Sequence, residues 1–126
     1  MTLLCMTKGS EVFKAGIAVA SISNWRNYDN IYTERYMHKP QDNASGYDDN
    51  SPVKFAKKLK GKLLIMHGLS DDNVHVQNSM DLINALIKAN KQFDMFLYPN
   101  RNHSIYGDNT RAHLYEKMTG FVLENL

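Results

Sequence analysis

Short apolar runs alternate with amphipathic stretches along this chain. Three runs are short and apolar enough to form buried β-strands, and they occupy residues 14–20, 62–66 and 93–98. Amphipathic or capped stretches predict helices at residues 29–37, 51–59, 76–90 and 111–123, and residues 1–6 are also helix-like. Strands that alternate with helices over short connections indicate an α/β fold, with a mostly parallel sheet flanked by helices.

Local signals define several boundaries of these elements. Asp29 stands at the start of one predicted helix, where a carboxylate opposes the positive end of the helix dipole. Ser51 and Pro52 form an N-cap and first-turn pair for the next helix. Residues 40–52 are dense in turn-forming residues and are predicted to be a loop, and His67-Gly68 is predicted to stop the second strand.

The size of the predicted sheet bears on domain organisation. Three parallel strands leave both faces and both edges to be covered, which is unusual for a domain that stands alone. We therefore expect residues 1–126 to be the C-terminal portion of a larger α/β domain. The uncovered surface also predicts a homo-oligomer.

Composition excludes several classes of protein. The 126 residues carry 15 Lys+Arg against 13 Asp+Glu, a balance that argues against nucleic acid as a partner. The single cysteine, Cys5, excludes an internal disulfide and a zinc site with several cysteines. No stretch approaches the roughly 18 apolar residues of a membrane span. The first residues lack the basic start of a secretory signal.

Two polar loops follow predicted strands, at residues 67–75 and 100–107. In parallel sheets such loops share one edge, so Asp71 and His103 can meet although they lie far apart in the chain. Acid before histidine is the order of the last two members of a Ser…Asp…His triad. Spacing alone leaves this open, because loop carboxylates and loop histidines are common, and Asp72 is a rival acid. His67 is interpreted as structural, and the loop is not expected to bind a metal.

Three segments together resemble one family. The loop HGLSDDNVH, the segment NWRNYDNIYTERYM at residues 24–37, and the strand FDMFLY followed by NRNHSIYG are similar to the prolyl oligopeptidase family, in its dipeptidyl peptidase IV branch. The resemblance extends over the whole chain. It implies an α/β-hydrolase catalytic domain in which Asp71 is the triad acid and His103 the general base.

The resemblance also implies a substrate. A peptide with proline, or alanine, at its second position would be cleaved to release an N-terminal dipeptide, without a cofactor. Asn73 would hydrogen-bond the carbonyl before the proline, although an Asn often braces its own turn. The proline pocket would be walled by Trp25, Tyr28, Tyr32 and Val74, with Ile22 nearby, whereas aromatic residues at such spacings are ordinarily core.

The sequence departs from the family pattern in one respect, the nucleophile. None of its eight serines lies in a G-x-S-x-G setting, and the resemblance places the serine before Met1. We expect the chain alone to be catalytically inert and the parent protein to be periplasmic or at the cell surface. Three alternatives stay open: a prolyl tripeptidyl peptidase, an acylaminoacyl peptidase, or a non-catalytic interaction or assembly relative.

Overall fold

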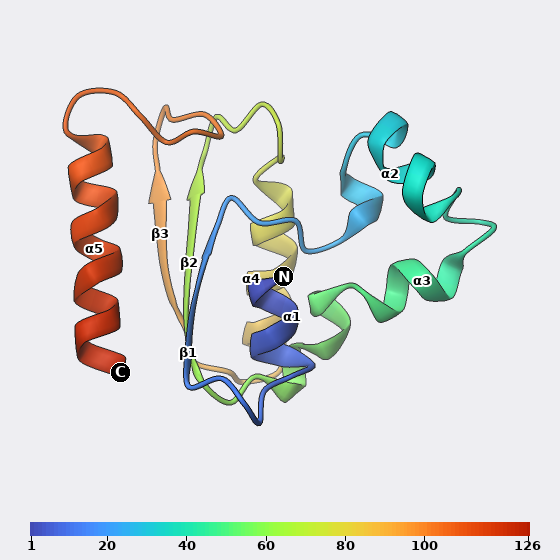
Figure 1. The fold of residues 1–126 in the computed structure, drawn as a ribbon, viewed down its shortest axis with the longest axis horizontal. Helices are drawn as coiled ribbons and strands as arrows, with labels where there is room; N and C mark the ends of the chain where they lie inside the picture. The colour runs from blue at the N-terminus through green and yellow to red at the C-terminus, as the bar shows by residue number, and fades with distance from the viewer.

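The computed structural model describes residues 1–126 and contains one parallel sheet. Its strands are β1 (Ala15–Val19), β2 (Lys62–Gly68) and β3 (Asp94–Tyr98), in the spatial order β1-β2-β3 (Figure 1). The three predicted strands are therefore present, and the predicted α/β class is confirmed. One boundary was wrong, because β2 continues through His67 and Gly68, which pair with Leu97 and Tyr98 of β3.

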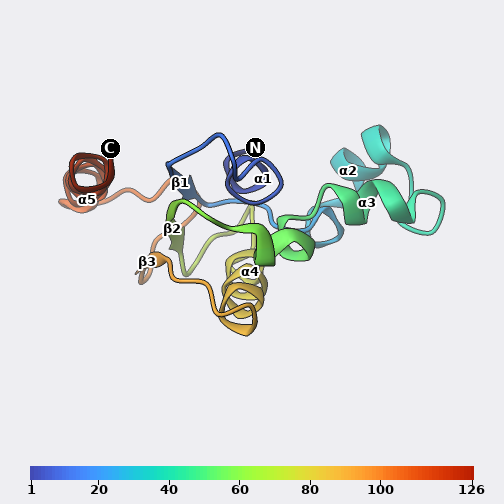
Figure 2. The same ribbon diagram turned by 90° about the horizontal axis from the view of Figure 1, so that it is seen from below.

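Helices cover both faces of this sheet (Figures 1 and 2). One face packs on α1 (Thr2–Thr7), α4 (Gln77–Lys88) and the 3₁₀ helix η2 (Pro52–Lys58), and the other on α5 (Thr110–Asn125). Alternate side chains of β2 pack on opposite faces of the sheet. Leu63 and Ile65 belong to the core with α4, whereas Leu64 and Met66 belong to the core with α5. Burial on both faces explains why this strand is a continuous apolar run.

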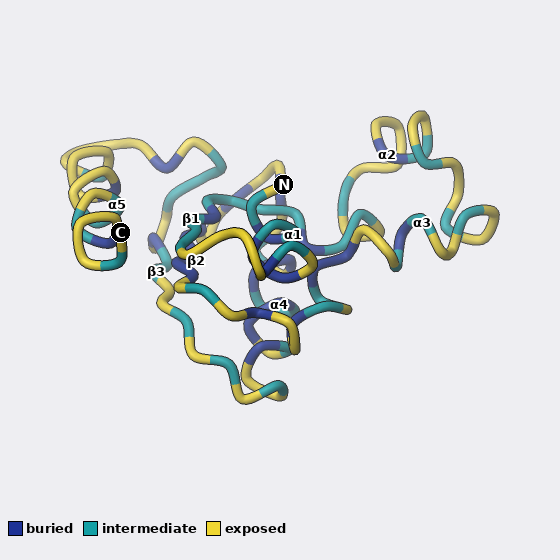
Figure 3. Tube along the Cα trace, turned by 60° about the horizontal axis from the view of Figure 1, so that its bottom comes forward, coloured by how far each residue is buried: buried dark blue, intermediate teal, exposed yellow.

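An arm of short helices extends away from the sheet between β1 and β2 (Figure 1). It contains the 3₁₀ helix η1 (Trp25–Asn27), α2 (Asn30–Met37) and α3 (Ala44–Asp49). Its outer parts are largely exposed, whereas burial is concentrated around β2 (Figure 3). As the sequence predicted, Asp29 caps α2, and its carboxylate accepts a hydrogen bond from the Tyr32 amide at 2.8 Å.

The helix α3 corrects the prediction of a loop over residues 40–52. The Asn43 side chain caps it by accepting the Gly46 amide at 3.2 Å. Tyr47 is 1% exposed and donates its hydroxyl to the His38 carbonyl at 2.7 Å. A single buried anchor therefore stabilises a helical turn among residues that otherwise favour loops.

Two buried serines hold the base of the arm. The hydroxyl of Ser23, where the chain enters the arm, donates to the Asn78 carbonyl at 2.6 Å, and the Asn78 side chain accepts the Ser23 amide. Where the chain returns, the Ser51 hydroxyl donates to the Ser23 carbonyl at 2.8 Å. Both ends of the arm are thereby tied to the first turn of α4.

None of the helices combines the length and apolar character needed to cross a bilayer.

Candidate active site

The loops after β2 and β3 leave the same edge of the sheet and are joined by their backbones. The amide of Leu69 donates to the carbonyl of Tyr98 at 2.9 Å, and the amide of Ser70 donates to the carbonyl of Arg101 at 3.0 Å. Gly68 permits this approach. A Cβ atom at position 68 would lie 2.6 Å from the Asn102 carbonyl oxygen and would overlap that of Arg101.

Asp71 lies in the first of these loops, and its side chain is fully buried. Its Oδ1 accepts the amides of Asn73 at 2.9 Å and Val74 at 2.8 Å, and its Oδ2 lies 2.9 Å from Nδ1 of His103. Burial alone would raise the pKa of Asp71. The hydrogen bonds from His103, Asn73 and Val74, with the attraction to His103, outweigh burial and lower that pKa below its usual value.

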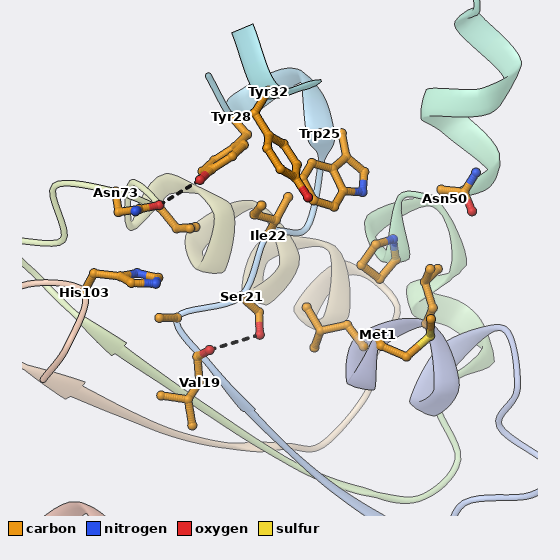
Figure 4. A pocket seen from close by; sticks show the side chains of 15 residues that line it. Met1, Val19, Ser21, Ile22, Trp25, Tyr28, Tyr32, Asn50, Asn73 and His103 are labelled. Carbon is orange, nitrogen blue, oxygen red and sulfur yellow. Dashed lines mark hydrogen bonds between the residues drawn. The ribbon is translucent and has the colours of Figure 1, made fainter. Parts of the chain in front are cut away.

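His103 lies in the second loop with its side chain 41% exposed. Because its Nδ1 faces the carboxylate of Asp71, the hydrogen bond favours a proton on Nδ1 and leaves a lone pair on Nε2. The ring points into a neighbouring pocket (Figure 4). Asp72 is exposed and forms no hydrogen bond or ion pair with His103, so the structure pairs His103 with Asp71. This arrangement is that of an acid-oriented general base.

The aromatic residues come from the arm and pack on one another. Trp25 stacks on Tyr32 with ring centroids 6.1 Å apart, and Tyr28 meets both rings edge-on at 5.9 and 5.6 Å. Tyr28 also donates its hydroxyl to Oδ1 of Asn73 at 3.0 Å. That bond connects the arm to the Asp71 loop (Figure 4).

These groups surround a cavity of about 490 Å³. Of the seven residues that the sequence singled out, six line it, and the seventh, Asp71, lies behind His103. The six are Trp25, Tyr28, Tyr32, Asn73, Val74 and His103, and Ile22, which was expected nearby, lines the cavity as well. The cavity therefore has apolar walls and two polar groups, the imidazole of His103 and the amide of Asn73, with the Asp71 carboxylate behind His103.

Sequence reasoning missed part of the lining. Val19, Ala20 and Ser21 contribute from the end of β1, Asn50 and Pro52 from the return of the arm, and α1 from its start. The end of β1 could have been identified, because it lies at the same edge as the other two strand ends. Asn50 and Pro52 carried no signal, since only the folded path of the arm brings them to the cavity.

Comparisons with known proteins identify the family of the chain. A family model described as the prolyl oligopeptidase family matches residues 1–126. The chain is 44% identical over 126 residues to a protein of Aspergillus terreus named "Probable dipeptidyl-aminopeptidase B", and 44% identical over 117 residues to one of the same name from Pyrenophora teres. The first match covers 98% of this chain and 14% of the relative, and the second covers 91% and 13%.

A solved structure is also similar to this chain. The crystal structure of Porphyromonas gingivalis dipeptidyl peptidase 4 is 52% identical, with a TM-score of 0.97 over 99% of this chain and 18% of that one. The match confirms that the three strands and their helices are part of an α/β-hydrolase fold. Because the family model matches all of residues 1–126 and the solved structure is similar over almost the whole chain, the chain belongs to the prolyl oligopeptidase family.

Proposed function

We propose that residues 1–126 are part of the catalytic domain of a serine dipeptidyl peptidase and supply its acid and its base. The observation that carries the proposal is the buried Asp71 carboxylate 2.9 Å from Nδ1 of His103, beside an aromatic cavity. The names of the relatives support the peptidase class. The chain spans about one seventh of the relatives' length, so the activity proposed is that of the whole protein.

In the proposed reaction, Nε2 of His103 takes the proton of the serine hydroxyl as the hydroxyl attacks the scissile carbonyl. The same nitrogen then gives the proton to the leaving amine, which breaks the C–N bond of the peptide. Asp71 stays ionised, holds the Nδ1–H tautomer and stabilises the imidazolium. Because no serine of this chain lies in a G-x-S-x-G turn, the nucleophile comes from residues outside this sequence. The chain alone is inert.

The proposed substrate has proline or alanine at its second position. A proline ring is compact and apolar, and in this proposal it packs inside the cavity against the side chains of Trp25, Tyr28, Tyr32 and Val74. The amide of Asn73 has a defined orientation, because its Oδ1 accepts the Tyr28 hydroxyl. Its NH₂ group is then directed to donate to a substrate carbonyl, the role proposed for it here.

The assembly and location of the protein are also proposals. Three large apolar side chains at the end of the chain are exposed: Tyr115 at 57% and Leu123 at 78% in α5, and Leu126 after it at 71%. A sheet of three strands also leaves edges to be covered, so we expect homo-oligomers. Analytical ultracentrifugation that finds only monomers would contradict that expectation. By its resemblance the protein is periplasmic or at the cell surface, which fractionation of cells and detection with an antibody would test.

The decisive experiment measures hydrolysis of Gly-Pro-p-nitroanilide by the complete protein that contains this sequence. Three comparisons run beside it: a His103→Ala variant, a His75→Ala variant, and the 126-residue chain alone. His75 is a matched control because it is an exposed histidine near Asp71 that does not line the cavity. We expect activity in the wild-type and His75→Ala proteins only.

A serine-directed phosphonate probe distinguishes the ways in which this could fail. An inactive complete protein that also leaves the probe unbound would contradict the proposed nucleophile and favour a non-catalytic relative. Cleavage of tripeptidyl or acylaminoacyl substrates in place of Gly-Pro-p-nitroanilide would be consistent with the proposed acid and base. It would contradict the proposed substrate specificity.

A further inference from the structure

A second histidine contacts the Asp71 loop from inside the sheet. His67, near the end of β2, is 0% exposed. Its Nε2 lies 2.8 Å from the Val74 carbonyl oxygen and 3.1 Å from Oδ2 of Asp71, and its Nδ1 lies 2.7 Å from the Ser79 hydroxyl. A buried titratable group so close to the proposed acid has no part in the reaction described above.

The partners of His67 define where its proton lies. A carbonyl oxygen can only accept, so Nε2 carries the hydrogen that the Val74 carbonyl receives. In the neutral ring Nδ1 then accepts the hydroxyl proton of Ser79, and both nitrogens are satisfied. Oδ2 of Asp71 therefore has the Nδ1–H of His103 as its hydrogen-bond donor at 2.9 Å, while Nε2 of His67 lies beside it at 3.1 Å.

We propose that His67 is a positioning residue that fixes the Asp71 carboxylate in the orientation His103 requires, an inference that rests on the proposed function. By holding the Val74 carbonyl, His67 holds the turn whose Asn73 and Val74 amides bind Oδ1. By facing Oδ2, it opposes rotation of the carboxylate away from His103.

The position of His67 in the fold makes it suited to this role. The groups hydrogen-bonded to the Asp71 carboxylate are backbone amides of its own turn and a half-exposed histidine on a neighbouring loop. Of the side chains that approach this carboxylate, His67 is the one on the central strand, where residues Leu63 to Gly68 are all buried. Through Ser79 it is also bonded to α4. His67 thus lies between the carboxylate, the buried central strand and α4.

The test compares His67→Gln with His67→Asn in the complete protein. A Gln amide reaches the position of Nε2 and can still donate to the Val74 carbonyl and face Oδ2, whereas an Asn amide reaches only the position of Nδ1, toward Ser79. Both variants are neutral and polar. Steady-state kinetics with Gly-Pro-p-nitroanilide gives kcat and KM, and proton NMR gives the far-downfield resonance of the His103 Nδ1–H, identified by its loss in His103→Ala.

For His67→Asn we expect kcat to fall by about 10- to 100-fold with KM within about twofold, because Asp71 and the base are misaligned while the pocket is intact. We expect the Nδ1–H resonance to move upfield or broaden. His67→Gln should restore most of kcat and the resonance. A merely structural histidine would lower the melting temperature in both variants and move neither readout.

Three results would be informative. A folded His67→Asn protein with wild-type kcat and an unmoved resonance would overturn the proposal, as would a His67→Gln protein no better than His67→Asn. If the wild-type protein hydrolyses no dipeptidyl substrate but the resonance shifts in His67→Asn and returns in His67→Gln, the positioning role stands and the proposed function fails.

Discussion

The contact between the two site loops depends on a glycine, and replacing it tests how the site is built. In Gly68→Ala the new Cβ would lie 2.6 Å from the Asn102 carbonyl oxygen. An ordinary van der Waals contact of a Cβ atom is 3.4 Å or longer. The obstructing atoms are backbone, so the loop that carries His103 must retreat. Overpacking of this kind costs about 1–3 kcal/mol of unfolding free energy. A displacement approaching 1 Å in a catalytic group costs about 100-fold in rate.

Gly120→Ala is the matched control for this substitution. Gly120 lies within α5, and a Cβ there would meet nothing within 4 Å. The same chemical change should therefore stabilise the protein by about 0.5–1 kcal/mol, because it removes the conformational freedom of a helical glycine.

Urea unfolding followed by circular dichroism measures both free energies, and hydrolysis of Gly-Pro-p-nitroanilide by the complete protein measures the rate. An unchanged unfolding midpoint and an unchanged kcat in Gly68→Ala would refute the idea that backbone contact at this position sets the geometry of the acid and the base.

Three further predictions concern the acid and the pocket. In the complete protein, Asp71→Asn should lower kcat by about 10⁴-fold, because an amide NH₂ facing Nδ1 favours the wrong tautomer of His103. Asp72→Asn should change kcat by no more than about twofold. Steady-state kinetics measures both values. Tyr28→Phe removes the hydroxyl that orients Asn73 and should raise KM by roughly 2- to 10-fold, with a smaller effect on kcat, in the same assay. The lowered pKa of Asp71 stabilises the fold above the unfolded pKa of about 3.9, and this contribution is lost as the pH falls through the lowered pKa. Acid titration of unfolding free energy should therefore be less steep in Asp71→Asn than in wild type, and equal slopes would contradict the assignment.

The sheet was predictable from the sequence because its strands carry their own signal. The central strand carries an apolar run from Leu63 to Met66, since both of its faces are buried there. The pairing of Asp71 with His103 follows from the rule that the carboxyl ends of parallel strands share one edge of a sheet. The extension of β2 through His67 was not predictable, because a buried histidine followed by glycine has the pattern of a strand end.

The arm was less predictable, because long-range contacts decide its conformation. The segment around α3 is rich in turn-forming residues, and only the burial of Tyr47 and the cap from Asn43 make part of it helical. The contribution of Asn50 to the cavity follows from the way Ser23 and Ser51 close the base of the arm on α4. Hydrogen bonds between buried polar groups so far apart in the chain leave no periodic trace in the sequence.

The two halves of the cavity are held in place by different kinds of contact, and this difference bears on function. The acid–base pair stands at the ends of two buried strands and is connected by backbone hydrogen bonds, which leave it few ways to move without disrupting the sheet. The aromatic wall of Trp25, Tyr28 and Tyr32 stands on an exposed arm. Ser23 and Ser51 hold the base of this arm, and the Tyr28–Asn73 bond connects the residue after η1 to the Asp71 loop. Regions with few buried contacts open at lower free energy than the core around them. We therefore expect the aromatic wall to tilt more easily than the acid–base pair as a substrate enters, which under the proposed function would place substrate selection and proton transfer in separate parts of the fold.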